Sequence, residues 1–289
     1  WSVLQSAQRI STIYLDELFG LFKTDRKLLP TVPVYSGSGI PFTISTHIII
    51  PKAAIGNGLA NFLGEHLNFF NNEYAVKQRM GLSTYETERF FRTIEKDEEH
   101  IKVPRGFLSL LLRYCDDQKI LYQLLDQTYC GDPQKYDFSC ALFDYQMTAV
   151  QALKNSRGGI LVAPPGSGKT VMGLSLIAEI RQPALILVHR KEIANQWLER
   201  TEHFLGIPKK KIGQVIGAKK KIQLPITVAM VQSLNRFENY GELANQFGLV
   251  LVDECHHMPA KMFRSAMTKL RPQYLYGLTA TPTRKHNDE

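Results

Sequence analysis

Apolar and polar positions alternate in blocks through the second half of the chain, from residue 142 onward. Five short runs are almost continuously apolar: 160–163, 184–188, 226–230, 249–252 and 274–278. Strands of this kind are buried on both faces, and the helical or polar stretches between them supply the crossovers of a parallel sheet. The pattern predicts an α/β fold in which helices, one of them over 171–180, cover both faces of the sheet.

The first half of the chain is patterned differently. Residues 1–29 place apolar side chains at helical spacing, and Pro, Gly and Ser then mark a connector. Strand-like and helical stretches follow, with strands expected at 42–50, 89–94 and 101–103 and helices at 51–67 and 107–115. We therefore predict four parts: a helical segment and linker (1–39), a small α+β module (40–129), a linker (130–141) and the α/β domain (142–289).

The composition is that of a globular protein without a membrane span. Hydrophobic residues make up 44% and charged residues 21% of the chain, and no apolar run approaches the roughly 18–20 residues that cross a bilayer. The net charge of +8 suits a polyanionic partner without proving one. The four cysteines form no C-x-x-C pair and no zinc spacing, so we expect reduced thiols and a cytoplasmic location, at the nucleoid in a bacterium; a Cys130–Cys140 disulfide is the alternative.

The stretch 158–170 carries the strongest chemical signature. An apolar strand runs into a glycine-bearing loop that ends in Lys169-Thr170 and opens a helix, which is the order that a phosphate-binding P-loop requires. Loop N–H groups and the helix N-terminus surround an oligophosphate, Lys169 reaches its β- and γ-phosphates, and the Thr170 hydroxyl ligates Mg²⁺. The residues expected to hold the nucleotide are Pro165, Gly166, Ser167, Gly168, Lys169 and Thr170. Ala163 replaces the first glycine of the general pattern, which points to a narrower subgroup.

Two carboxylates follow the apolar strand at 249–252. Asp253 stands at the C-terminal end of the strand, where it can hold Mg²⁺ through water. Glu254 can orient an attacking water and take its proton, as hydrolysis requires. We therefore expect Lys169, Asp253 and Glu254 to be catalytic.

Three motifs together resemble those of superfamily 2 helicases. Residues 163–170, 253–256 and 279–281 are similar to motifs I, II and III of these motors, and the Gly-Leu-Thr-Ala-Thr-Pro form of 277–282 resembles the DNA-directed XPB-like and restriction-motor branch. The resemblance implies that residues 142–285 form a RecA-like P-loop NTPase lobe that uses ATP and Mg²⁺. It also implies that His256 joins the catalytic group, linking the Mg²⁺ site to motif III. Thr279 and Thr281 would couple hydrolysis to the nucleic acid.

The same resemblance extends to neighbouring stretches. Residues 188–197 and 228–234 are similar to motifs Ia and Ib, which touch the nucleic-acid backbone in the family. The contacts implied for this chain are those of His189, Arg190, Gln232 and Ser233. Gln146 resembles the glutamine that reads adenine, although the usual Arg-Pro pair before the Tyr-Gln is Phe143-Asp144 here. Trp197 lies in a helical pattern, which favours a core position over a base-stacking one.

Residues 40–129 resemble, more loosely, the segment before the motor in bacterial XPB-like helicases, with 104–108 as the most familiar part. In that family a module at this position is associated with DNA engagement. Basic residues stand among aromatic ones in this region: Lys77, Arg79, Arg89, Arg92, Lys102 and Arg105 with Tyr74, Tyr85, Phe90 and Phe91. This mixture suits phosphate contact and base stacking, and equally a solvated basic face over an aromatic core. The lysine runs 209–211 and 219–221 favour solvated loops near the expected DNA path.

The motifs predict an ATP hydrolase, specifically an ATP-dependent DNA helicase or translocase acting on single-stranded or forked DNA. Only seven residues follow Pro282, so we expect the second RecA-like lobe to lie outside this chain and the chain alone to hydrolyse ATP very weakly. A translocase subunit of a restriction or phage-defence system and an RNA helicase are the alternatives. A DNA-binding module with a vestigial nucleotide site is a third, which the intact Lys169, Thr170, Asp253 and Glu254 disfavour.

Overall fold

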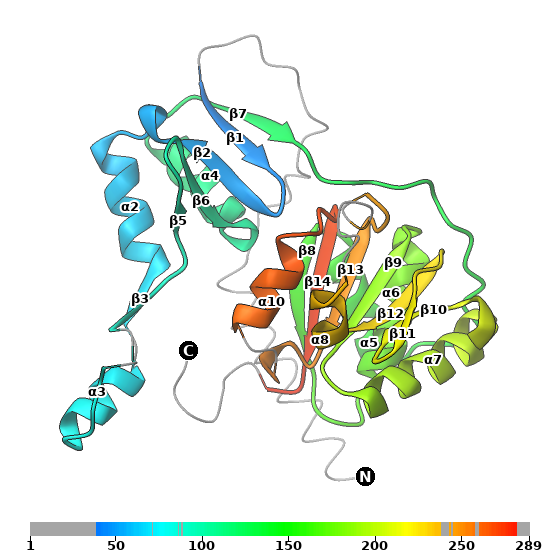
Figure 1. Ribbon diagram of the computed structural model, residues 1–289. Helices are drawn as coiled ribbons and strands as arrows, with labels where there is room; N and C mark the ends of the chain where they lie inside the picture. The colour runs from blue at the N-terminus through cyan, green and yellow to red at the C-terminus, as the bar shows by residue number, and fades with distance from the viewer. Residues whose placement is uncertain are drawn as a thin grey trace.

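The computed structural model describes residues 39–70, 72–85, 87, 89–237, 243, 245–257 and 260–281 (Figure 1). Two sheets organise this part of the chain, one built from residues 40–126 and the other from residues 158–279. The expected N-terminal helical segment and the seven residues after Pro282 lie outside the described residues. In the described part, no helix combines the length and the apolar character needed to cross a membrane.

The first sheet has five strands in the order β5-β6-β2-β1-β7. The bounds are β1 Ile40–Ile44, β2 His47–Pro51, β5 Glu95–Lys96, β6 His100–Pro104 and β7 Tyr122–Asp126. Only β1 and β7 pair in parallel. Helices α2 (Asn57–Leu67) and α4 (Leu108–Asp117) bury their apolar stripes, including Leu63 and Leu111, against Phe42 and Ile48 of the sheet. A two-stranded ribbon, β3 (Asn68–Phe70) with β4 (Phe90–Arg92), leads outward to helix α3 (Asn72–Arg79) (Figure 1).

The second sheet has seven strands in the order β11-β10-β12-β9-β13-β14-β8. The bounds are β8 Gly158–Val162, β9 Ala184–Val188, β10 Gly213–Ile216, β11 Lys219–Lys221, β12 Ile226–Met230, β13 Leu249–Asp253 and β14 Tyr274–Thr279. All pairs are parallel except that of β10 with the edge strand β11. The α/β fold is therefore confirmed, with a mixed sheet rather than a purely parallel one.

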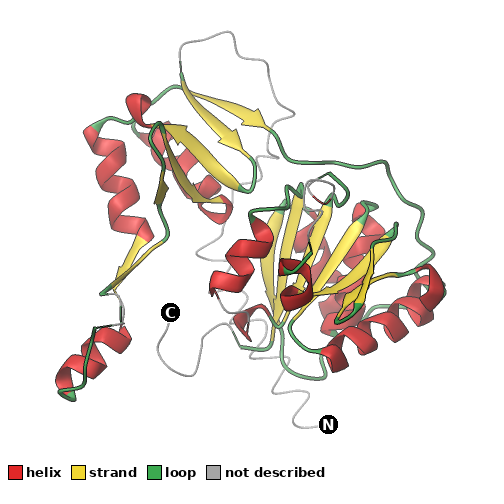
Figure 2. Ribbon diagram, viewed as in Figure 1, coloured by secondary structure: helices red, strands yellow, loops and turns green. Residues whose placement is uncertain are grey.

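Helices cover both faces of this second sheet (Figure 2). They are α5 (Asp144–Lys154), α6 (Lys169–Ile180), α7 (Lys191–Leu205), α8 (Val231–Asn235) and α10 (Ala260–Met267). Strand β9 shows why its run is continuously apolar: Ala184, Ile186 and Val188 pack into the core with α6 and α7, while Leu185 and Leu187 pack into the core with α8 and α10. Both faces need apolar side chains because both are buried.

A set of contacts joins the two sheets, and we call it the joint. The Arg105 guanidinium donates hydrogen bonds to the carbonyls of Pro272 and Gln273, the latter at 3.0 Å. Arg157 forms an ion pair with Asp126 at the end of β7. The Tyr129 backbone bridges to 271–273, accepting from the Gln273 N–H at 3.0 Å. The joint therefore holds the first sheet against the N-terminal ends of β8 and β14, far from the ends that carry the P-loop and motif III.

The segment expected as a linker, 130–141, is extended and is bonded to the second sheet's domain along its length. The Gly131 N–H donates to Gln182 Oε1 at 2.7 Å, the Tyr136 hydroxyl donates to the Gln182 carbonyl at 2.8 Å, and the Ser139 N–H donates to the Phe204 carbonyl at 2.9 Å. We call this segment the strap. Its Gly and Pro residues mark an absence of helix or strand, and its polar groups find partners on the domain surface.

Two expectations for the first sheet were wrong in detail. The strand expected over 42–50 is a hairpin of β1 and β2, because the chain turns at Ser45-Thr46, where the Ser45 N–H bonds the His47 carbonyl. The helix expected over 51–67 begins as a short 3₁₀ turn (Lys52–Ala54), and α2 starts only after Gly56. Apolar content alone does not locate a two-residue turn.

Candidate nucleotide-binding and hydrolysis site

The loop between β8 and α6 has the backbone of a phosphate cradle. Gly166 and Gly168 have φ of 80° and 85°, a region that favours glycine. Gly168 precedes α6, whose N-terminus faces the loop with unsatisfied N–H groups and the positive end of its dipole. A Cβ on Gly168 would lie 2.5 Å from Gln146 Nε2, so no other residue fits there without displacing that side chain.

Gly168→Ala is expected to destabilise the protein by about 1–3 kcal/mol, because it adds a contact with Gln146 to a left-handed backbone angle. Gly206→Ala is the matched control, since Gly206 has φ of 64° and open space around the missing Cβ. Urea unfolding of both variants measures the difference. Equal losses of stability would show that the Gln146 contact does not constrain the loop.

Lys169 turns back over the loop that it follows. Its Nζ donates to the carbonyls of Ala163 at 3.0 Å and Pro164 at 3.4 Å, and lies 4.0 Å from Glu254 Oε1. Strands β13 and β8 are parallel and have only β14 between them, so the loops that follow them lie close together at the C-terminal edge of the sheet. The lysine charge and the motif II carboxylates therefore meet at one place.

Asp253 is a buried carboxylate that two donors hold in place. Its Oδ1 accepts the Glu254 N–H at 2.9 Å, and its Oδ2 accepts the Trp197 indole N–H at 2.7 Å. Burial raises the pKa of the Asp253 carboxyl above its usual value, against the opposing effect of the Trp197 hydrogen bond. A bound cation would offset this penalty, so the environment suits a metal ligand.

Glu254 occupies an unusual backbone conformation beside Asp253. Its φ is 46°, a left-handed angle that costs free energy for a non-glycine residue and that clusters at functional sites. Its buried Oε2 accepts no hydrogen bond among the described residues, and His256 Nδ1 lies 3.4 Å away. That oxygen is enclosed by protein, and the imidazole of His256 is the polar group beside it.

His256 and the two threonines after β14 are brought together as expected. His256 Nδ1 lies 2.6 Å from Thr279 Oγ1, and that hydroxyl donates to the Thr281 carbonyl at 2.7 Å. Because the Thr279 proton is used in this bond, His256 Nδ1 is the donor in the first one. A chain of polar contacts thus runs from Glu254 through His256 to Thr279 and Thr281.

The Gln146 side chain is buried and bonded to protein, unlike an exposed side chain that is free to contact adenine. Its Oε1 accepts the Phe143 N–H at 3.0 Å, which caps α5, and its Nε2 donates to the Ser167 carbonyl at 2.9 Å. The side chain is buried, with 5% exposed. In this structure Nε2 holds the P-loop against α5 and Oε1 caps that helix, so a contact with adenine would require these groups to change partners.

The residues expected to contact nucleic acid gather where β9, β12 and β10 end. Gln232 Nε2 donates to the His189 carbonyl at 3.2 Å, and Arg190 is exposed at the start of α7. Ser233 is instead buried, and its Oγ accepts the Gly217 N–H at 2.9 Å, so its hydroxyl fixes a turn. The lysine runs at 209–211 and 219–221 are exposed, but they are not the loops expected: the first is a 3₁₀ turn and the second is the edge strand β11.

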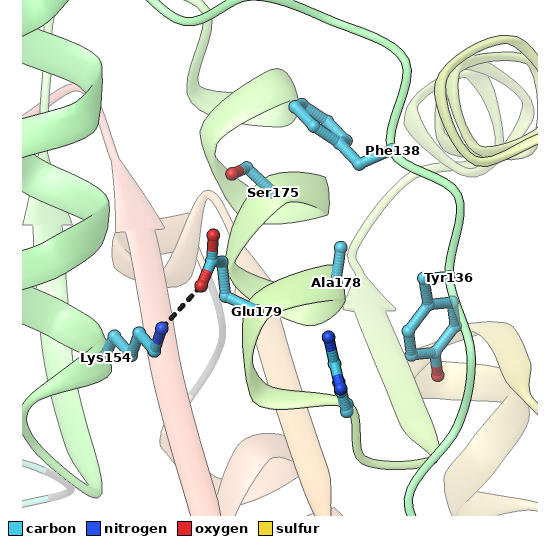
Figure 3. Close-up of a pocket in the computed structure, with 7 residues that line it drawn as sticks. Tyr136, Phe138, Lys154, Ser175, Ala178 and Glu179 are labelled. Atoms are coloured by element: carbon cyan, nitrogen blue, oxygen red, sulfur yellow. Dashed lines mark hydrogen bonds and ion pairs between the residues drawn. The ribbon is translucent and has the colours of Figure 1, made fainter.

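A hollow of about 520 Å³ lies away from these motifs (Figure 3). It is bounded by Tyr136 and Phe138 of the strap, by Arg181, and by helices α5 and α6, where Lys154 pairs with Glu179. No P-loop or motif II residue lines it. The hollow is therefore separate from the residues of the candidate nucleotide site.

The motif residues fit ATP and Mg²⁺. The glycine cradle and Lys169 match a triphosphate, while Thr170 and the buried Asp253 carboxylate offer the oxygen ligands that Mg²⁺ prefers. The contact of Trp197 with Asp253 was missed, because the helical pattern indicated only burial. The one available hint is chemical: a buried indole N–H needs an acceptor.

Comparisons with known proteins agree with this geometry. Residues 139–284 match the family described as "Type III restriction enzyme, res subunit". The chain is 36% identical over 155 residues to "DNA 3'-5' helicase XPB" of Kineococcus radiotolerans, covering 52% of this chain and 28% of that protein. It is 33% identical over 143 residues to "DNA 3'-5' translocase XPB2" of Sulfurisphaera tokodaii, covering 50% of this chain and 31% of that protein. The chain thus spans less than a third of the length of these relatives.

A solved structure shares the fold of most of the described chain. The UvsW helicase from bacteriophage T4 superposes with a TM-score of 0.60 at 18% identity, over 84% of this chain and 92% of that one. The matched part, 84% of this chain, is longer than the α/β domain alone, so the likeness includes the first sheet. At this identity the likeness concerns fold alone.

Proposed function

The chain belongs to the family "Type III restriction enzyme, res subunit", and from this membership we propose that it is the module and first motor lobe of an ATP-dependent DNA helicase or translocase. Its relatives confirm the resemblance to XPB-like superfamily 2 helicases over about half of the chain. The observation that carries the proposal is the approach of Lys169 Nζ to Glu254 Oε1, 4.0 Å apart at one sheet edge. A phosphate binder and a candidate base for water there fit hydrolysis better than transfer to a bound substrate.

In the proposed mechanism the cradle of Pro165–Thr170 binds the triphosphate, and Lys169 turns from its loop carbonyls to the β- and γ-phosphates. Thr170 and Asp253 would hold Mg²⁺, which would supply positive charge to neutralise the phosphate oxygens. Glu254 orients a water molecule toward the γ-phosphate and takes its proton. The contacts of His256 with Thr279, and of Thr279 with Thr281, connect the hydrolysis site to the nucleic-acid face. A change at the nucleotide is transmitted to the nucleic acid through them.

Lys169→Ala tests whether this loop binds nucleotide. We expect the affinity for ATP to fall by about 10–100-fold, the loss of a hydrogen bond to a charged group. Displacement of a fluorescent ATP analogue measures it in this chain. Lys154→Ala is the control, since Lys154 pairs with Glu179 beside the hollow and touches no motif. Equal affinity of Lys169→Ala and the wild type would refute nucleotide binding at the P-loop.

We propose DNA as the nucleic-acid partner, contacted by His189, Arg190 and Gln232, with residues 40–129 as a separate module that helps to engage it. The names of the relatives support DNA, and a protein with a net charge of +8 suits a polyanion. In the module, Arg79 and Arg89 remain exposed on the ribbon and helix α3, whereas Arg105 is used in the joint. Stimulation of ATP hydrolysis by RNA and not by DNA would favour the RNA helicase alternative.

A further inference from the structure

Trp197 stands between the P-loop helix and the motif II strand. Its side chain is fully buried on α7, and a Cβ on Gly173 of α6 would come 3.0 Å from its ring. Its indole Nε1 lies 2.7 Å from Asp253 Oδ2. One side chain of the motif Ia helix therefore contacts both the helix that begins at the P-loop and the carboxylate expected to hold Mg²⁺.

The hydrogen bond satisfies the buried indole N–H and also orients the Asp253 carboxylate. An indole N–H can only donate, so it fixes an acceptor and never competes as a ligand. With the Glu254 N–H on Oδ1, a separate donor holds each oxygen of Asp253. Two donors set the plane of the carboxylate, and each oxygen keeps another lone pair for a metal or its water. Groups that orient a ligating side chain in this way tune metal affinity.

We propose that Trp197 is a positioning residue for the metal site. Its N–H orients the Asp253 carboxylate, so that binding of a metal ion to this carboxylate changes the environment of Trp197 on α7. The inference rests on the proposed function, because it takes Asp253 to be the Mg²⁺ ligand. Trp197 then has two roles: it packs in the hydrophobic core, and it orients a metal ligand. A phenylalanine would fill most of the same space and make no such bond.

Trp197→Phe tests the bond. Mn²⁺ is the probe, titrated in the presence of ADP and followed by the electron paramagnetic resonance of the free ion. We expect Mn²⁺ affinity to fall about tenfold, the size of effect typical of a lost orienting partner. Affinity for ADP without metal should not change. Leu198→Ala is the control, because it opens a buried cavity on the same helix and leaves the Trp197–Asp253 bond in place. A tenfold loss in Leu198→Ala as well would overturn the proposal, since packing would then explain both.

The indole itself supplies a second measurement on the folded protein. The chain has two tryptophans, Trp1 and Trp197, so Trp1→Phe leaves one emitter. Its emission should shift or be quenched when Mn²⁺ and ADP bind, and this response should vanish with Asp253→Asn. Unchanged emission at Mn²⁺ concentrations that saturate the site would overturn the proposal even if Trp197→Phe fails to fold.

The nucleotide site and the role of Trp197 can be refuted separately. If the wild-type chain binds no Mn²⁺ with ADP, the proposed nucleotide site is refuted, and this inference with it. If the wild type binds the pair and a folded Trp197→Phe binds it equally well, only the role of Trp197 is refuted. Replacement of Trp197 by 3-benzothienylalanine, which keeps the bicyclic shape but has sulfur in place of the ring N–H, should lower Mn²⁺ affinity as Trp197→Phe does; unchanged affinity would show that the shape of the ring, and not the bond, matters.

Discussion

Glu254→Gln is expected to keep the affinity for ATP and Mg²⁺ and to lose turnover by roughly 10²–10⁴-fold, the usual contribution of a general base. The amide has the size of the carboxylate but cannot take a proton from water. The backbone angle of 46° directs this side chain toward Lys169 and His256, 4.0 Å and 3.4 Å from its oxygens, and a glutamine keeps that placement. Binding should therefore survive the change that stops the chemistry.

The measurement is phosphate release in the intact protein with DNA present, beside ATP-analogue binding to this chain. Glu199→Gln is the matched control: Glu199 is an exposed carboxylate on α7 that pairs with Lys209, so turnover should not change. Unchanged hydrolysis by Glu254→Gln would remove Glu254 from the mechanism. Loss of binding together with turnover would instead mean that Glu254 organises the loop through Lys169.

The sequence predicted the parts of the fold that depend on continuous apolar runs. All five strands expected in the second half are present, because a strand buried on both faces must be apolar throughout. Strands β10 and β11 were missed. β10 is a four-residue strand that contains a glycine and a glutamine, so it forms no continuous apolar run. The three consecutive lysines of β11 are typical of a solvated loop and pair here only because β10 offers a free edge. Such pairing depends on distant residues, and so local pattern does not reveal it.

The candidate site was predictable in its members and not in its contacts. Motif spacing led to the expectation that Lys169, Asp253 and His256 share one edge of the sheet, and the structure brings them together there around Glu254. The bonds of Gln146 to Ser167 and of Trp197 to Asp253 join residues 21 and 56 positions apart, and only the folded chain brings them together. Spacing identifies which residues carry chemistry, whereas packing decides which residues orient them.

Arg105→Met is expected to loosen the joint and to lower the free energy of unfolding by about 2–4 kcal/mol, because two carbonyls lose a charged donor. Burial lowers the pKa of the Arg105 guanidinium to about 10, so it stays protonated at neutral pH and pairs as a cation. Methionine keeps much of the length and none of the donors. The Asp126–Arg157 pair remains, so we expect weakened docking and not complete separation.

Calorimetry of the chain measures this change, with Arg113→Met as the control, since Arg113 is exposed on α4 of the same module. The variant should unfold in two steps or in one broadened step, because the first sheet keeps its own core of Phe42, Leu63 and Leu111. ATP binding should be unchanged, because the joint lies at the opposite ends of β8 and β14 from the nucleotide site. A single sharp transition at the wild-type temperature would show that Arg105 does not hold the sheets together.

DNA-stimulated hydrolysis tests whether docking of the two sheets matters for DNA engagement. If it does, stimulation of the intact protein should fall in Arg105→Met while nucleotide affinity stays constant. That result separates a mechanical role of the joint from a chemical one.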